Sequence, residues 1–171
     1  MYINVWLSCI CFSFRRDIFD YKNINCFFFF NNSSIFFTVN IYSDKHQSAL
    51  NYLKDTKANI RDVLTMAGNF NIRDRDWNFL YSFYSFHSDS LMEIADSFEL
   101  KLSSPVYQVP TCYADNHNNS NSIINLLFLW PNSVKMDNYF ILDSWYPSDH
   151  TPLTIYHGRI NLGKKMHYYQ K

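Results

Sequence analysis

Glycine and net charge are the two things this chain has least of. Only three of its 171 residues are glycine, so each glycine position calls for a backbone explanation. Lysine plus arginine equals aspartate plus glutamate at 15 each, and the formal net charge is zero. A neutral chain argues against a general polyanion-binding surface of the kind that drives salt-dependent DNA binding. Neutrality does not exclude local basic patches. The candidates are Arg15-Arg16, Arg73 and Arg75, and Lys164-Lys165, although such scattered pairs are usually solvated surface.

Cysteines are few and carry no metal-site spacing. The four residues are Cys9, Cys11, Cys26 and Cys112, which we expect to be buried free thiols in a reducing compartment. The apolar stretch from Met1 to Phe14 lacks a positive leading segment and is too short to span a bilayer. This stretch predicts a strand, with a signal anchor as the alternative. We expect the protein to be intracellular, in the nucleus or cytoplasm, and not secreted.

Hydrophobic residues make up 47% of the chain and charged residues 18%, which indicates a globular protein. The length suits one domain, predicted over residues 1–158, followed by a basic and disordered tail at 159–171. Aromatic residues are frequent at 19%, and an A/T-rich codon bias would produce this excess without functional meaning.

The hydrophobic pattern predicts strands interrupted by two helices. The strands are expected at residues 2–14, 25–30, 35–42, 64–67, 123–129, 139–142 and 151–156. The Asn/Ser cluster at 31–34 predicts a hairpin turn. One helix should start near Asp44, with Ser43 as its cap, and its apolar spacing runs through Ala49, Leu53, Thr56, Ile60 and Val63 or Leu64. A second is expected at 89–98, and Pro105 and Pro110 should bracket a loop or edge strand. This order predicts an α/β fold, a mixed sheet with covering helices.

Polar residues lie at the end of one of these apolar runs, inside a second and just before a third. They lie in Gly68-Asn69-Phe70-Asn71, in the strand that begins Ser122-Ile123-Ile124-Asn125, and in Ser148-Asp149-His150. Strand ends are where binding and catalytic groups collect. In order and spacing, the three blocks resemble the endonuclease/exonuclease/phosphatase superfamily, whose blocks read G-D-F-N, S-x-I-D-x-x-F and S-D-H. This chain has Asn69 and Asn125 where the superfamily has aspartate.

The resemblance extends over residues 15–156. The segment Asn71-Ile72-Arg73-Asp74, with Trp77 soon after, is similar to the endonuclease domains of LINE-type (non-LTR) retrotransposons. The resemblance to the superfamily implies an incomplete four-layer α/β/β/α sandwich. The superfamily's first strand supplies an Asn and the next segment a Glu that help hold the metal. Neither has an equivalent here, and the chain is expected to be an N-terminally truncated copy.

The resemblance also implies a set of site residues. His150 would face the phosphate, Asp149 would lie near a Mg²⁺ or Mn²⁺ ion, and Asn71 matches the last residue of G-D-F-N. Asn69 and Asn125 replace the carboxylates that handle the water and orient the histidine. Tyr42 matches a phosphate-contacting tyrosine, with a place in the aromatic core as its alternative. The residues of the three blocks should converge in one cleft, with His150 within about 10 Å of Asn69.

These features predict a domain descended from a Mg²⁺-dependent DNA endonuclease that is catalytically impaired or inactive. DNA is the expected partner, with no membrane and no protein partner indicated. An active divalent-metal endonuclease and a non-catalytic protein-interaction module are the alternatives. Asn69 can also be read as a turn residue, and Trp77 as packing. The remaining histidines show no ligand spacing and are interpreted as surface residues: His46, His87, His117, His157 and His167.

Overall fold

The computed structural model describes residues 12–15, 23–31, 34–56, 63–78, 84–103, 110–112, 121–131, 139–141 and 153–155. Within these ranges six strands form one sheet, in the spatial order β1-β2-β3-β4-β6-β5. Their bounds are β1 Phe12–Arg15, β2 Ile24–Asn31, β3 Ser34–Tyr42, β4 Val63–Asn69, β5 Lys101–Leu102 and β6 Asn125–Leu129. The β3–β4 pair is parallel, and the other pairs are antiparallel, so the sheet is mixed as predicted.

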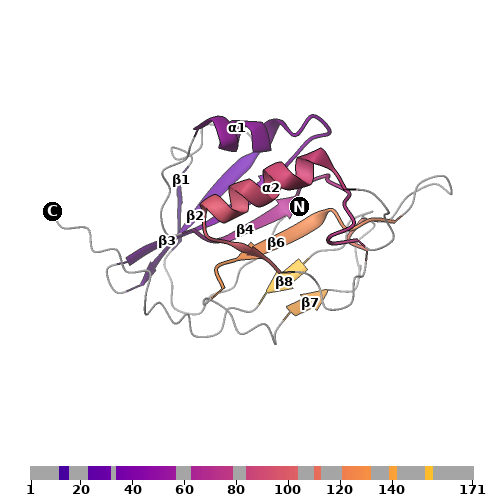
Figure 1. Ribbon diagram of the computed structural model, residues 1–171. Helices are drawn as coiled ribbons and strands as arrows, with labels where there is room; N and C mark the ends of the chain where they lie inside the picture. The colour runs from indigo at the N-terminus through magenta and orange to yellow at the C-terminus, as the bar shows by residue number, and fades with distance from the viewer. Residues whose placement is uncertain are drawn as a thin grey trace.

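Two helices, α1 (Ser48–Thr56) and α2 (Phe86–Ser97), lie together on one side of this sheet (Figure 1). A separate antiparallel ribbon pairs β7 (Tyr139–Ile141) with β8 (Leu153–Ile155), and Figure 1 draws it below β6. Neither helix has the length and apolar character needed to cross a membrane, and the described ranges contain no other candidate span.

Both faces of the central strands are buried, which requires a layer on each side. Every residue of β4 and of β6 is buried. Met66 and Phe128 are register partners and belong to the core that also contains Leu50 of α1 and Leu91 of α2. Side chains alternate along a strand, so Asn69 and Asn125, with Ala67 and Leu127, point to the opposite face. Burial on that face fits a sandwich of two sheets with helices outside.

The observed strands confirm most of the predicted ones. The expected strands at 25–30, 35–42, 64–67, 123–129, 139–142 and 151–156 coincide with β2, β3, β4, β6, β7 and β8. Asn31 pairs with Ser34, which is the predicted hairpin. The first strand is confirmed at Phe12–Phe14, whereas residues 1–11, the tail at 159–171, and Cys9 and Cys11 lie outside the described residues.

The first helix differs from its prediction at both ends. It begins at Ser48, because the turn from Asp44 to Gln47 precedes it, and the Asp44 carboxylate accepts hydrogen bonds from the Ser48 backbone N–H at 3.1 Å and from its hydroxyl. Ser43 is therefore not the cap. Val63 and Leu64 belong to strand β4 and not to the helix, since both faces of that segment are buried. The edge strand β5 precedes Pro105, and the loop or edge strand predicted between Pro105 and Pro110 lies outside the described residues.

Gly68 allows β3 and β4 to approach each other closely at the end of the parallel pair. Its φ is +147°, a conformation that residues with a side chain rarely adopt. A Cβ atom at this position would overlap the carbonyl oxygen of Ile41, its register partner. The glycine thus sets the backbone spacing just before Asn69.

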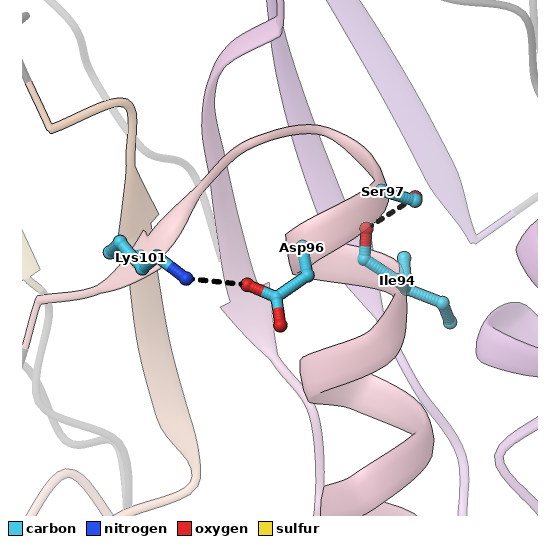
Figure 2. Close-up of polar contacts among 4 residues, drawn as sticks. All are labelled: Ile94, Asp96, Ser97 and Lys101. Atoms are coloured by element: carbon cyan, nitrogen blue, oxygen red, sulfur yellow. Dashed lines mark hydrogen bonds and ion pairs between the residues drawn. The ribbon is translucent and has the colours of Figure 1, made fainter.

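Helix α2 ends in a left-handed turn that leads directly into β5. Glu99 has a φ of 59°, and the Leu100 N–H donates to the Ala95 carbonyl at 2.9 Å, as in a Schellman motif. Figure 2 shows the neighbouring contacts of this turn. The Ser97 hydroxyl donates to the Ile94 carbonyl at 2.6 Å, and the Lys101 ammonium lies 2.7 Å from the Asp96 carboxylate.

Candidate functional site

Three of the predicted site residues lie on one rung of the sheet. Tyr42 pairs with Asn69 across the parallel β3–β4 ladder, and Asn69 pairs with Asn125 across the antiparallel β4–β6 ladder. Residues paired in register share a face of the sheet. Tyr42 is 54% exposed, whereas Asn69 and Asn125 are buried, so the row runs from the surface into the interior.

Asn69 and Asn71 form the turn that ends β4. The Asn69 side-chain oxygen accepts the backbone N–H of Asn71 at 2.9 Å, which is the hydrogen bond of an Asx turn. Asn71 takes up a left-handed conformation with a φ of 52°, and asparagine tolerates this better than most residues. Its amide donates to the Ser43 carbonyl at 2.6 Å, so the ends of β3 and β4 are tied together.

Asn125 is held by Thr111, a residue that the sequence did not single out for this role. The Thr111 hydroxyl accepts the backbone N–H groups of Ile124 at 3.0 Å and Asn125 at 2.9 Å. The Asn125 amide in turn donates to the Thr111 carbonyl at 3.3 Å. Both side chains are buried, and this contact requires a donor at position 125.

Asp149 and His150 lie outside the described residues, and Thr151 and Pro152 separate them from β8 in the sequence. The expected convergence therefore stays a prediction for these two, including the distance from His150 to Asn69. The described members, Asn69, Asn71 and Asn125, do gather at one end of neighbouring strands.

A cleft of about 550 Å³ opens where β3 and β4 end and β6 begins. Tyr42, Asn71 and Ile124 line it, whereas Asn69 and Asn125 are buried and are not among its lining residues. The other lining residues come from the loops after β3 and β4 and from the start of α2. They are Asp44, Lys45, Gln47, Ile72, Arg73, Ser85 and His87.

His87 lies in the first turn of α2, which starts earlier than predicted, and it lines this cleft. The expected start was near Asp89, where the apolar pattern begins, but the helix begins at Phe86 with Ser85 as its N-cap. Phe86 in the first turn is exposed, so it does not belong to the apolar face from which the helix was predicted. His87 is exposed, as expected for a surface histidine, but it lines the cleft. The serine at position 85 was the sequence signal for this start.

A buried carboxylate anchors the first turn of α2 to the loop after β4. Asp74 is fully buried and accepts hydrogen bonds from the Ser85 backbone N–H, from the Ser88 hydroxyl at 2.7 Å and from the Asp76 backbone N–H at 2.9 Å. Negative charge is favourable at a helix N-terminus. Trp77, predicted to be a packing residue, is buried, and its indole N–H donates to the Ile72 carbonyl at 3.3 Å.

Among the described lining residues, Asp44, Lys45 and Arg73 carry charge, and His87 also lines the cleft. Hydrogen bonds from the backbone and then the side chain of Ser48 lower the pKa of the Asp44 carboxyl, which is therefore ionised at neutral pH. Lys45 and Arg73 are exposed, so the described part of the lining carries a small excess of positive charge.

The described residues do not fit a divalent metal. Within the described ranges, no three His, Cys, Asp or Glu side chains come together as metal ligands. Magnesium is held by carboxylate oxygens in near-octahedral geometry. The carboxylate of the cleft, Asp44, already accepts from Ser48, and the Asn69 oxygen accepts from Asn71.

No family model matches the chain, and neither does any curated protein. Among solved structures, it is similar to the endonuclease domain of TRAS1, a telomere-specific non-LTR retrotransposon, with a TM-score of 0.63 and 16% identity over 83% of this chain. The match covers 64% of the TRAS1 chain, so this chain spans less than two thirds of that domain's length.

Two further solved structures also match. SmcL has a TM-score of 0.43 and 14% identity, over 76% of this chain and 56% of SmcL. A β-hairpin deletion mutant of β toxin from Staphylococcus aureus has a TM-score of 0.31 and 10% identity, over 74% and 54% of the two chains. The TRAS1 similarity establishes the fold, and it confirms the fold class and the resemblance to retrotransposon endonuclease domains that the sequence predicts.

Proposed function

We propose that this chain is a retrotransposon-type endonuclease domain that has lost most or all of its phosphodiesterase activity and keeps a DNA-binding cleft. The observation that carries the proposal is the rung of Asn69 and Asn125, which puts two amides side by side at the end of β4 and the start of β6. The resemblance expects carboxylates at both positions, and the fold matches an endonuclease domain.

The chemistry of an amide supports the loss of activity. Phosphodiester hydrolysis needs a group that accepts or orients the proton of the attacking water and a cation over the phosphoryl oxygens. An amide is nearly isosteric with a carboxylate, but it has no charge to attract Mg²⁺ and cannot take up a proton. In addition, the Asn69 oxygen and the Asn125 amide are engaged in local hydrogen bonds to Asn71 and Thr111.

The cleft supports DNA as the partner. Lys45 and Arg73 are exposed at its wall, and Tyr42 and Asn71 offer hydroxyl and amide groups to phosphate oxygens. With zero net charge on the whole chain, DNA binding should be weak and confined to this cleft.

We assign the domain to residues 1–158 and a basic tail to 159–171.

A nicking assay on supercoiled plasmid tests the proposal. The full chain, with Mg²⁺ or Mn²⁺, is expected to nick no faster than its His150→Ala variant. Metal-dependent nicking that His150→Ala abolishes would overturn the proposal in favour of an active endonuclease. Absence of any DNA binding by the same preparation would instead favour a protein-interaction module.

A further inference from the structure

Exposed aromatic side chains gather beside the cleft. Tyr42, Tyr84 and Phe86 are the large hydrophobic side chains that the described ranges leave exposed, at 54%, 59% and 79%. Tyr42 lines the cleft, and Tyr84 and Phe86 flank Ser85, which also lines it. Single exposed apolar residues are ordinary, but a group at one cleft indicates a binding surface.

Tyr84 and Phe86 are held in place by charged or polar neighbours and not by the core. The Arg75 guanidinium lies over the Tyr84 ring, 4.3 Å from its centre. The Phe86 ring meets the His87 ring edge-on, with 5.9 Å between the ring centres. Because Asp74 fixes the first turn of α2 through Ser85 and Ser88, both rings project from a positioned backbone.

The charge around these rings suits a polyanion. Arg73, Arg75 and Lys45 are exposed cations at or next to the cleft. The nearby carboxylates are Asp44, which is bonded to Ser48, the buried Asp74, and the exposed Asp76 and Asp89. Cations interleaved with aromatic rings are the combination that binds single-stranded nucleic acid, where phosphates meet the charges and bases stack on the rings.

We propose that Tyr84 and Phe86 form a stacking platform for unpaired nucleobases, with Arg75 supporting Tyr84 and with Arg73 and Lys45 contacting the phosphates. The proposal rests on the proposed DNA-binding cleft and adds the form of DNA that it prefers. A base must be out of its duplex to present its face to a side chain, so the platform selects single strands or unpaired ends over intact duplex.

Fluorescence anisotropy of the full chain tests the platform with three labelled probes of about ten nucleotides, a length in the range of single-strand binding sites. The probes are oligothymidylate, a duplex of equal length, and an abasic strand that keeps the phosphates but has no bases. Oligothymidylate should bind at least about fivefold more tightly than either control probe. The variants Tyr84→Ala and Phe86→Ala should each weaken its binding about tenfold, whereas Tyr84→Phe and Phe86→Tyr should retain it.

Arg75→Ala should weaken oligothymidylate binding, while Lys54→Ala, which removes an exposed cation from α1, provides the matched control and should not. Equal affinity for the three probes, or unchanged binding by the two alanine variants, would overturn the platform while leaving a phosphate-binding cleft intact. If no probe binds, both the platform and the proposed DNA binding are wrong. Plasmid nicking by the unmodified chain would contradict only the proposed loss of catalysis.

Discussion

At the scale of single residues, the surroundings of position 125 suit an amide side chain. Its side-chain nitrogen donates to the Thr111 carbonyl at 3.3 Å, and its backbone N–H donates to the Thr111 hydroxyl at 2.9 Å. Since both residues are buried, water cannot replace either contact. A carboxylate here, as in the superfamily that the sequence resembles, would therefore set an acceptor against the Thr111 carbonyl.

We expect Asn125→Asp to lower the free energy of unfolding by about 3 kcal/mol at pH 7. The substitution removes the amide donor and places a buried negative charge against the Thr111 carbonyl oxygen. Asn69→Asp is the matched change, and it should cost about 1 kcal/mol, since its oxygen can still accept the Asn71 N–H. Urea unfolding monitored by circular dichroism measures both. Equal losses in the two variants would show that the Thr111 contact does not decide the difference.

The sequence predicted that Asn69 and Asn125 lie together, but it did not predict the residues that support the site. Asn69 and Asn125 could be placed together because both stand in motif blocks that resemble those of one superfamily. The supporting roles of Asp74 and Thr111 were not predicted, because their partners lie 11 to 14 residues away along the chain: Ser85 and Ser88 for Asp74, and Ile124 and Asn125 for Thr111. No local periodicity encodes hydrogen bonds between loops of that separation.

At the scale of elements, α2 depends on a residue outside it. Asp74 holds the N-cap residue and the third residue of the helix, and the Ser85 hydroxyl adds a longer bond of 3.3 Å to the His87 N–H. Asp74→Ala should lower the free energy of unfolding by about 3 kcal/mol, because buried donors lose a charged acceptor. Ser85→Ala should cost about 1 kcal/mol or less, as a single cap does.

Thermal and urea unfolding of these two variants tests the anchoring, and hydrogen exchange locates it. The amides in the first turn of α2 should lose protection in Asp74→Ala at a denaturant concentration that leaves β4 protected. A loss spread evenly over the sheet and the helices would mean that Asp74 supports the whole core and not the helix start.

Element types were easier to predict than element ends. Apolar runs identified β4 and β6 as strands, but the end of α1 could not be told from the start of β4, because Val63 and Leu64 fit both a helical spacing and a buried strand. At α2 the error was one turn, and it hid the place of His87 at the cleft.

At the scale of the whole molecule, burial on both faces of β4 and β6 is the link between sequence and architecture. Apolar runs predicted these strands in a mixed sheet with covering helices, and the resemblance supplied the layered arrangement in which both faces of β4 and β6 are buried. The pattern alone could not select that fold among α/β folds. The TRAS1 similarity did so at 16% identity, a level at which topology persists after most side chains have changed.

The stability of the folded chain should fall in alkaline solution because of Cys26. Burial raises the pKa of its thiol from 9.0 to about 12, so the unfolded chain releases this proton at a lower pH than the folded chain does. The contribution is complete below pH 9 and is lost between pH 9 and pH 12, at about 1.4 kcal/mol per pH unit. Urea unfolding of the chain and of Cys26→Ala at pH 8 and pH 10 isolates this contribution from those of lysines and tyrosines. The stability difference between the two proteins should shrink by about 1.4 kcal/mol at pH 10. A difference that stays constant with pH would mean that the thiol ionises as readily in the folded chain as in the unfolded one.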